Sequence, residues 1–439
     1  MKRNYWAVPV AAALALGLTA CGGTTDADTT GGDDATTSSD AGSGDVTLTM
    51  SGWSLATTPE FQTLVDGFES ENPGVTIEIK EYDPNEYENL MLTDMTSGQA
   101  PDIITIKQAK FTYQWAEGGQ LYDVSDIVSG LSSDVSGAGS YEVDGVNYAV
   151  PYRQDSWFLF YNKDLFDQAG VEAPTKAWTW DEYTGIAQQL TTNLAAAGST
   201  AKGAYLHSWQ STVQGFANAQ ADADIFAGDY GYMKPFYDYN ITLQQAGAQE
   251  SYGNVTTNKL TYQAQFGKQS AAMMLMGSWY AATLLSQQAS GDADSFTWGI
   301  APAPQVDGTT LEKPITFGDP TGMAIYAKID DAKLEAAQDF LAYIASEKAA
   351  TSLVEIGIMP SSFSDSVSDA YFAQDGMPTD DLTKFAVGTR ETRPENPVGE
   401  TIMEVQSVLG IAHTSIMSES SGVDEALALA GEDVLNENW

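Results

Sequence analysis

The fold of this chain is decided by residues 46–79, which read VTLTMSGWSLATTPEFQTLVDGFESENPGVTIEI. Alternating apolar and polar residues at its start predict a strand over residues 46–53. TPE at residues 58–60 then supplies an N-cap candidate and a proline for the first helical position. The helix that follows carries an apolar stripe at helical spacing, made by Phe61, Leu64, Val65 and Phe68. NPG ends this helix, and alternation returns as a second strand at residues 75–79.

The next part of the chain extends this pattern. A second helix is predicted over residues 87–96, and an apolar third strand over residues 103–106. Strands that alternate with helices in this way predict a parallel sheet with helical crossovers. Ligands bind beyond the carboxyl ends of the strands in such open sheets, and Trp53 and Lys107 stand at two of these ends.

Further elements are predicted beyond residue 106. An aromatic run covers residues 148–161, and a helix opens at residues 178–182, followed by a loop or weak helix at 191–203. The apolar spacing of Ala337, Phe340, Leu341 and Ile344 predicts a helix that continues through Leu353, and a closing helix is predicted over residues 423–434. No internal repeat interrupts this order, so two domains would be joined by short ordered segments.

Composition and charge restrict the function. The chain has 439 residues, 43% of them hydrophobic, which is ample for a core and long enough to make two domains the default expectation. Lys and Arg number 19 against 60 Asp and Glu, a formal charge of −41, so nucleic acids and anionic lipid surfaces would be repelled. Two histidines and one cysteine leave little scope for zinc clusters, Cys/His nucleophiles or disulfide frameworks.

The amino terminus is predicted to direct the chain to the cell surface. Residues 1–20 resemble a secretory signal peptide, with Lys2 and Arg3 before an apolar stretch too short to span a bilayer. LTA followed by Cys21 resembles a bacterial lipobox, in which the cysteine is lipidated; a buried core cysteine is the alternative. Residues 22–44 contain only Gly, Thr, Ser, Ala and Asp, so residues 21–44 are expected to be a lipidated cysteine with a disordered acidic tether.

Six stretches along the chain together resemble the sugar-binding lipoproteins of ABC importers, of the maltose-binding-protein type. Each stretch alone is weak evidence, and the ordered set, which runs from about residue 46 to residue 435, is strong. The stretches are FESENPGV at 68–75, SGQAPDI at 97–103, EGGQLYDV at 117–124, YNKDLF at 161–166, TWDE at 179–182 and GSW at 277–279.

The resemblance implies a two-lobed α/β fold of the periplasmic-binding-protein kind, with a ligand cleft between lobes that close by a hinge motion. The chain is expected to cross between lobes near residues 151–154, near 302 and near 359. An N-terminal lobe would then hold residues 45–152 and 302–358, and a C-terminal lobe residues 153–301 and 359–439. Proteins of this family usually catalyse nothing, and neither a cofactor nor a metal is expected.

A cleft that binds a sugar needs aromatic faces for stacking on the apolar face of a pyranose ring. Trp279 follows Gly277-Ser278 where the family carries a stacking aromatic, and Trp53 and Trp209 are further candidates. Core packing is the alternative for Trp53 and Trp209. Trp178 and Trp180 resemble a structural motif of the family and are expected to pack at a helix start.

The hydroxyl rim of a sugar needs charged or polar partners, which form the stronger hydrogen bonds. By resemblance, Asp155 is the first choice, with Tyr152 and Arg153 as neighbours; a hinge ion pair between Arg153 and Asp155 is the alternative. The other polar candidates are Lys107, Asp319 and Arg393, with Arg390 as a near alternative to Arg393 and surface pairing as the alternative for both arginines.

The sequence therefore favours capture of an extracellular oligosaccharide and its delivery to ABC permease subunits, by a monomer anchored to the outer face of a Gram-positive cytoplasmic membrane. A binder of a non-sugar solute in the same fold is the first alternative, and a surface-anchored glycoside hydrolase is the second. A hydrolase would need two carboxylates at a defined separation, and no catalytic signature is visible. His207 and His413 are expected to be ordinary polar residues and not metal ligands.

Overall fold

The computed structural model describes residues 45–56, 58–221 and 223–436. The predicted signal peptide, Cys21 and the predicted tether all lie in residues 1–44, outside these ranges. Within the described ranges, no helix combines the length and the apolar character that a membrane crossing requires.

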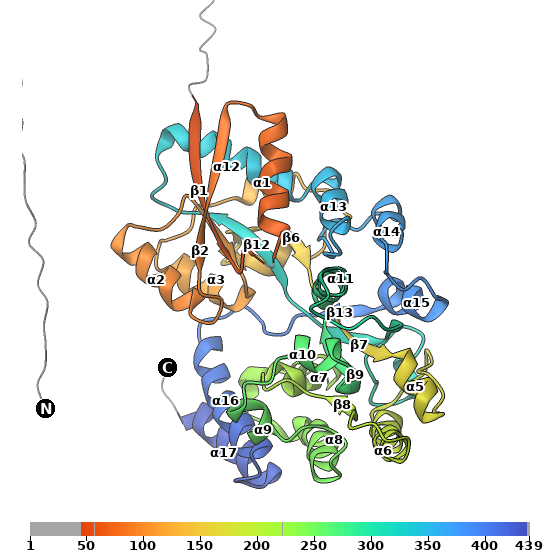
Figure 1. The fold of residues 1–439 in the computed structure, drawn as a ribbon. Coiled ribbons are helices and arrows are strands. Elements are labelled where there is room, and N and C mark those ends of the chain that lie inside the picture. The colour runs from red at the N-terminus through yellow and green to blue at the C-terminus, as the bar shows by residue number, and fades with distance from the viewer. Residues whose placement is uncertain (1–44, 57, 222, 437–439) are drawn as a thin grey trace, which may run out of the picture. The chain divides into compact units, whose positions relative to one another are not determined.

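The first sheet has five strands in the order β2-β1-β3-β12-β6 (Figure 1). β1 (Val46–Trp53) pairs in parallel with β2 (Val75–Tyr82) on one side and with β3 (Ile103–Ile106) on the other. β12 (Pro320–Ile325) pairs antiparallel with β3 and with β6 (Val150–Gln154). The three parallel strands confirm the sheet predicted from the opening of the chain, and two later strands complete it.

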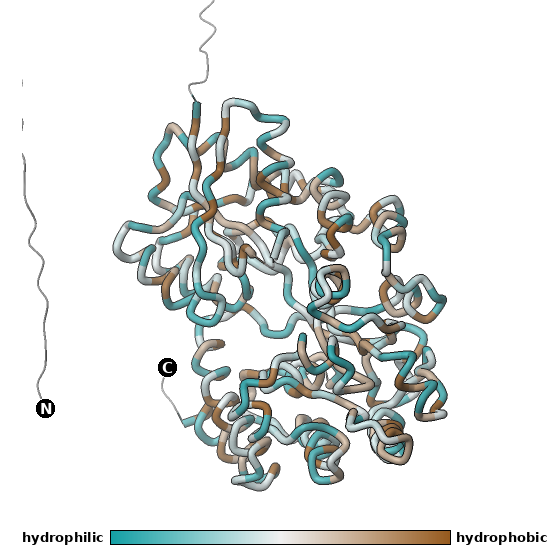
Figure 2. The backbone as a smooth tube through the Cα atoms, viewed as in Figure 1, coloured by the Kyte–Doolittle hydropathy of each residue, from teal (hydrophilic) through white to brown (hydrophobic). Residues whose placement is uncertain are grey.

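Helices α1 (Glu60–Glu71) and α12 (Asp331–Ile344) pack against the strands of this sheet (Figure 1). α1 begins directly after Pro59, and its predicted apolar stripe is buried, which confirms the helical spacing. Hydrophobic and hydrophilic stretches alternate along the outer helices (Figure 2), as expected when one face of a helix packs on a sheet. The smaller elements of this part are α2 (Tyr87–Ser97), η1 (Ala109–Phe111), α3 (Thr112–Glu117), α4 (Ser125–Ser129), η2 (Ala138–Tyr141), β4 (Glu142–Val143) and β5 (Val146–Asn147).

The second sheet has four strands in the order β10-β7-β9-β8. β7 (Trp157–Asn162) lies antiparallel to β10 (Trp298–Ala301) and to β9 (Ala271–Gly277), while β8 (Lys202–Tyr205) is parallel to β9. β7, β9 and β10 are buried along their whole length, as expected for strands covered on both faces.

Helices surround the second sheet. They include α6 (Trp180–Ala196), which starts with a capping box between Thr179 and Glu182 and buries Trp178 and Trp180, so the predicted packing of this helix start is confirmed. The other elements are α5 (Lys163–Ala169), α7 (Ser211–Ala221), η3 (Ile225–Ala227), η4 (Gly231–Met233), α8 (Lys234–Gln245), α9 (Tyr252–Thr257), α10 (Tyr262–Gly267), α11 (Tyr280–Ser290), η5 (Gly308–Thr310), α14 (Asp365–Phe372), α15 (Asp381–Thr389), α16 (Ile402–Met417) and α17 (Val423–Asn436).

Two local predictions differ from the structure. The helix expected to continue through Leu353 is divided into α12 and α13 (Glu347–Val354), because Ser346 has an extended backbone and its hydroxyl accepts a hydrogen bond from the Ala349 amide as the N-cap of α13. The stretch expected as a loop or weak helix contains the start of β8, whose KGAY sequence lacks β-branched residues. Pairing with β9 makes it a strand.

The two sheets have separate hydrophobic cores, and the chain passes between them three times. β6 ends at Gln154 in the first sheet and β7 begins at Trp157 in the second. At the third passage Ile358 packs in the first core and Met359 in the second. The first and third crossing segments are joined by a hydrogen bond from the Ser361 amide to the Tyr152 carbonyl oxygen, at 2.9 Å.

The second passage comes later than the expected position near residue 302. Ala303, Ile315 and Phe317 pack in the second core, and β11 (Ile315–Phe317) pairs in parallel with β13 (Glu391–Arg393). The chain therefore returns to the first sheet between Phe317 and β12. The expected boundary was placed at the end of β10, whereas the apolar side chains after β10 still pack on the second core.

Candidate functional site

Five aromatic side chains from different parts of the chain meet at one end of the second sheet. Trp157 opens β7, Trp279 follows β9, His207 and Trp209 lie between β8 and α7, and Tyr262 opens α10. The ring centroids of Trp157 and Trp279 lie 5.6 Å apart, and those of Trp157 and Trp209 lie 6.4 Å apart. The Trp209 centroid lies 4.4 Å from that of His207 and 5.6 Å from that of Tyr262. We call these five residues the aromatic cluster.

Four rings of the aromatic cluster are buried or half-buried, and the fifth, Trp209, is exposed. Trp157 is only 3% exposed and stacks on Phe317 with a centroid distance of 4.9 Å. Trp279 and Tyr262 are half-buried and share a side-chain hydrogen bond. Trp209 is 40% exposed, so it presents its indole to solvent from a cluster that is otherwise fixed.

Gly277 makes room for Trp279 in this arrangement. A Cβ atom at position 277 would meet the Trp279 ring at 1.9 Å, so only glycine lets the indole lie across the end of β9. Ser278 between them donates a hydrogen bond of 2.8 Å to Asp155 Oδ1. The GSW stretch thus joins an aromatic face to a carboxylate.

A buried ionic network connects that carboxylate with the first lobe. Asp155 Oδ2 lies 2.9 Å from Arg153 Nε, and Arg153 Nη1 donates to both carboxylate oxygens of Glu60, at 2.9 and 2.7 Å. Tyr152 donates a 2.7 Å hydrogen bond to Glu60 Oε1, and Arg153 Nη2 donates to Thr321. The ion pair that the sequence left open as an alternative for Arg153 and Asp155 is therefore present, and Tyr152 is fully buried beside it.

Burial and pairing oppose each other in the pKa values of this network. Burial alone would lower the pKa of Arg153, but the carboxylates of Asp155 and Glu60 raise it. Burial raises the pKa of Asp155, and Arg153 and the Ser278 hydroxyl oppose that shift. Ser278 and Arg153 thus fix the orientation of the Asp155 carboxylate, which can accept a hydrogen bond from a ligand hydroxyl group.

The first lobe places Trp53 and Lys107 together at the carboxyl ends of β1 and β3. Lys107 Nζ lies 5.6 Å from the Trp53 ring centroid and donates to the Pro84 carbonyl oxygen at 2.5 Å. Trp53 packs edge-on against Phe61 and Tyr87, and burial lowers the pKa of Lys107. The two residues form a cation–π pair whose indole belongs to the first core.

Asp319 forms part of a carboxyl pair with Glu395. Asp319 Oδ1 accepts a 2.8 Å hydrogen bond from the Glu395 amide. Burial raises the pKa of Asp319 to about 6, and burial together with Asp319 raises the pKa of Glu395 to about 7. Lys110, in η1 of the first lobe, opposes both shifts.

The two candidate arginines have different surroundings. Arg393 Nε donates to Glu391 at 3.0 Å and Nη1 donates to the Ala219 carbonyl oxygen at 2.7 Å. Arg390 contacts the neighbour of Asp155, because its Nε donates a hydrogen bond of 2.8 Å to the hydroxyl of Ser156. Burial lowers the pKa of Arg390 to about 10.

The predicted site residues are thus divided among several places. Trp209 and Trp279 both contact Trp157. Asp155 contacts Arg153 and Ser278, the residue before Trp279. Trp53 with Lys107, and Asp319 with Glu395, form separate pairs. Sequence reasoning missed Trp157, Tyr262 and the carboxylate of Glu60. The aromatic run at 148–161 was a signal for Trp157, while Tyr262 and Glu60 had none, because their partners are distant in sequence.

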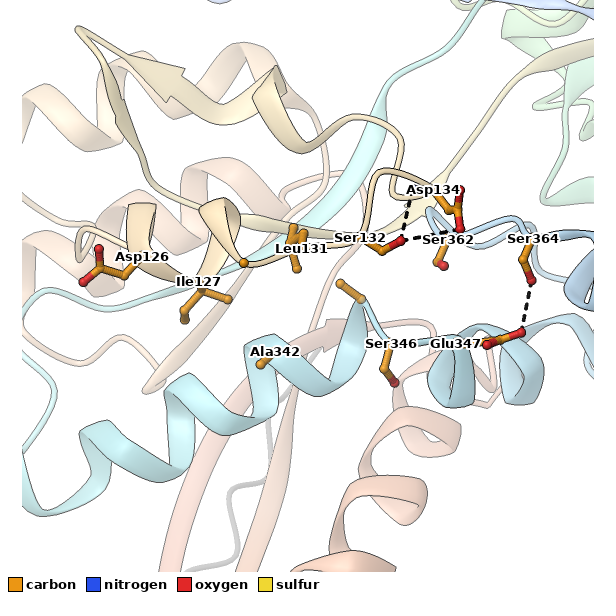
Figure 3. A pocket seen from close by; sticks show the side chains of 12 residues that line it. Asp126, Ile127, Leu131, Ser132, Asp134, Ala342, Ser346, Glu347, Ser362 and Ser364 are labelled. Atoms are coloured by element: carbon orange, nitrogen blue, oxygen red, sulfur yellow. Dashed lines mark hydrogen bonds between the residues drawn. The ribbon is translucent and has the colours of Figure 1, made fainter.

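A pocket of about 480 Å³ is lined by side chains of the first lobe together with Ser362 and Ser364, which follow the third crossing. Figure 3 shows its lining, in which Ser132 contacts Asp134 and Ser364 donates to Glu347. None of the predicted ligand residues lines it. Among the described residues, no group of three or more His, Cys, Asp or Glu side chains could hold a metal ion.

Comparison with known proteins identifies the family. Residues 52–351 match the family described as bacterial extracellular solute-binding protein. This chain belongs to that family. The solute-binding protein is similar in structure to a sugar transporter of Rhizobium etli in an open conformation, with a TM-score of 0.74 and 29% identity over 89% of this chain and 100% of that one. That similarity establishes the two-lobed fold.

Curated relatives align over shorter regions. A multiple sugar-binding protein of Streptococcus mutans is 23% identical over 253 residues, 54% of this chain, and an uncharacterized lipoprotein of Streptomyces antibioticus is 32% identical over 148 residues, 31% of this chain. The aligned regions span 58% and 31% of the lengths of these two relatives, and 37% of the length of a binding protein of Brucella abortus.

Proposed function

We propose that this solute-binding protein captures an extracellular oligosaccharide between its two lobes and delivers it to the permease of an ABC importer. The observation that carries the proposal is the aromatic cluster, in which the indole of Trp209 is exposed and Trp279 follows Ser278, the hydrogen-bond partner of the Asp155 carboxylate. Family membership and the sugar-binding names of relatives support a sugar as the solute.

In this proposal Trp209 and Trp279 stack on the apolar faces of sugar rings, and Asp155 accepts hydrogen bonds from hydroxyl groups. Arg153 and Tyr152 orient Asp155 through the buried network with Glu60. The aromatic rings spread over several elements, which favours an oligosaccharide over a monosaccharide.

The remaining candidates would complete the site from the first lobe and the crossings. Lys107, above Trp53, and Asp319, beside Glu395, would bind hydroxyl groups at the edges of the ligand. Of the two arginines, Arg390 is the better placed to bind the ligand, because it contacts Ser156 next to Asp155.

Calorimetric titration of the purified protein with a panel of oligosaccharides tests the proposal. We expect saturable micromolar binding to one linkage class, a change in tryptophan fluorescence and no new product. No detectable binding to any oligosaccharide of the panel would favour a non-sugar solute in the same fold. Release of shortened sugars would instead support a glycoside hydrolase.

We also propose that Cys21 carries a lipid after removal of residues 1–20, and that a monomer is held on the outer face of a Gram-positive membrane by the acidic stretch at 22–44. The name of one relative, a lipoprotein, supports the anchor. Labelling cells with a fatty acid tests it: Cys21→Ala should abolish the label and release the protein into the medium. A label that persists in this variant would contradict the anchor.

A further inference from the structure

The loop that carries Trp209 connects β8 with α7. Thr212, in the first turn of α7, is buried, and its hydroxyl donates to the carbonyl oxygens of Trp209, at 2.6 Å, and of His207, at 3.1 Å. These bonds fix the backbone on the α7 side of the loop. The exposed indole of Trp209 is packed on part of its surface only, so its direction depends on what holds the neighbouring residues.

The residue after Trp209 is held by α16. The side-chain amide of Gln210 donates to the side-chain oxygen of Gln406 and, at 3.4 Å, to its backbone carbonyl oxygen. Gln406 is only 7% exposed, so this partner is shielded from water. Gly410 lies one turn further along α16, and a Cβ atom there would meet Gln210 Oε1 at 2.7 Å. The Gln210 amide therefore lies between the side-chain oxygen of Gln406, which accepts its hydrogen bond, and the space left by Gly410.

A second set of contacts joins α7 to the same helix. Gln214 donates to the carbonyl oxygen of Leu409 at 2.9 Å and to Tyr237 Oη at 2.8 Å. Tyr237 Oη in turn lies 3.2 Å from His413 Nδ1. Burial lowers the pKa of His413 to about 4, which keeps this histidine neutral near pH 7. Uncharged groups thus fix α7 on α16 beneath the loop.

We infer that Gln406 and Gly410 position Trp209 for ligand stacking by holding the side chain of Gln210, and so set the affinity without contacting the ligand. The inference rests on the proposed function, because it assigns the stacking role to Trp209. Helix α16 also contacts η1 of the first lobe, so the element that positions Trp209 touches both lobes.

Gly410→Ala tests the positioning role. Alanine favours a helix over glycine, so a purely structural role predicts unchanged or higher stability and unchanged binding. We expect the thermal midpoint to stay constant or rise while the affinity for the best oligosaccharide of the panel falls about tenfold, or about 1.4 kcal/mol. Gly185→Ala is the matched control, since Gly185 lies inside α6 with open space around it.

Gln406 supplies a second pair of variants. Gln406→Leu removes the acceptor for Gln210 and should weaken binding by a similar factor, whereas Gln406→Glu keeps an acceptor oxygen and should restore most of the affinity. In a Trp209→Ala background neither Gly410→Ala nor Gln406→Leu should weaken binding further. If Gly410→Ala or Gln406→Leu lowered the affinity of the Trp209→Ala protein as much as that of the unaltered protein, the inference would be overturned.

A measurement without ligand separates this inference from the proposed function. Trp157, Trp209 and Trp279 lie close enough for their indoles to couple, so their exciton circular dichroism reports the orientation of Trp209. Gly410→Ala should reduce this signal as Trp209→Phe does. If no sugar binds the unaltered protein, the proposed function fails, and the exciton signal still decides whether α16 positions Trp209. An unchanged signal in Gly410→Ala overturns the inference.

Discussion

Two tryptophans near the carboxyl ends of strands, Trp53 and Trp209, have opposite surroundings. Trp53 ends β1 and packs against Phe61 and Tyr87, with centroid distances of 4.9 and 5.1 Å, and is 8% exposed. Trp209 lies in the loop between β8 and α7, contacts the rings of Trp157, His207 and Tyr262, and is 40% exposed. From the sequence alone, stacking on a sugar and packing in the core were open for both tryptophans.

The difference shows that the element covering a strand end decides the role of an aromatic residue there. Helices α1 and α2 supply Phe61 and Tyr87 and enclose Trp53 in the first core. The loop after β8 has no such cover, and Trp209 projects from rings that are already packed on one another. Trp53→Ala and Trp209→Ala test this contrast directly. Variants of Arg153 and of Asp319 test the buried charged groups of the candidate site.

Arg153→Met should give the largest effect. It leaves the buried Glu60 carboxylate without its cation, so the free energy of unfolding should fall by about 3–5 kcal/mol, measured by urea denaturation. Lys348→Met is the control: it breaks the exposed pair with Glu71 and should cost less than about 1 kcal/mol. Equal losses in the two variants would contradict the buried network.

Trp53→Ala should lower the free energy of unfolding by about 3–4 kcal/mol, because it removes a ring packed in the first core. Urea denaturation measures the loss. Leu429→Ala, at a side chain that is 56% exposed, should change stability by no more than about 0.5 kcal/mol. A Trp53→Ala protein of nearly normal stability with a large loss of affinity would place Trp53 with the ligand-binding residues.

Trp209→Ala should show the reverse pattern. Its stability should change by less than about 1 kcal/mol, while sugar affinity falls by about 2 kcal/mol, roughly 30-fold, in calorimetric titration. Trp209→Phe keeps an aromatic face and should retain most of the affinity. A large loss of stability with normal binding would assign Trp209 to the core and end the contrast with Trp53.

The smallest effect concerns the carboxyl pair of Asp319 and Glu395. Both carboxyls have higher pKa values in the folded chain than when unfolded, so the folded state holds more protons between about pH 4 and about pH 7. Stability should therefore fall as the pH rises through this window, because the folded chain releases these protons less readily than the unfolded chain. Asp319→Asn should flatten the dependence in urea denaturation series, and an unchanged slope would contradict the assignment to this pair.

Much of the fold could be predicted because its signals are local. The stripe from Phe61 to Phe68, the alternation in β1 and the capping box at Thr179 each lie within one element, and the structure confirms them. The break at Ser346 was missed because the apolar spacing continues across it. β8 was missed because only Tyr205 in its KGAY sequence is of a type enriched in strands. In both places a capping bond or a neighbouring strand decided the outcome.

The candidate site could be predicted only in part. Trp279 and Asp155 were candidates by resemblance to the family, and the structure joins their places through the hydrogen bond from Ser278 to Asp155. Tyr262 and Glu60 stood in unremarkable contexts, and their roles come from partners such as Arg153, which is 93 residues from Glu60.

The sequence by itself determined the family, the alternation of strands and helices, the strong acidity and the motifs that point to the cell surface. These features depend on residue types and short spacings, which a linear chain displays directly. The tertiary structure alone decided that Trp53 is enclosed while Trp209 is exposed, that the second crossing follows Phe317, and that α16 holds the loop beside Trp209. The physical reason is that burial and hydrogen bonding depend on which distant elements pack together, and the packing of complementary surfaces is a property of the whole fold.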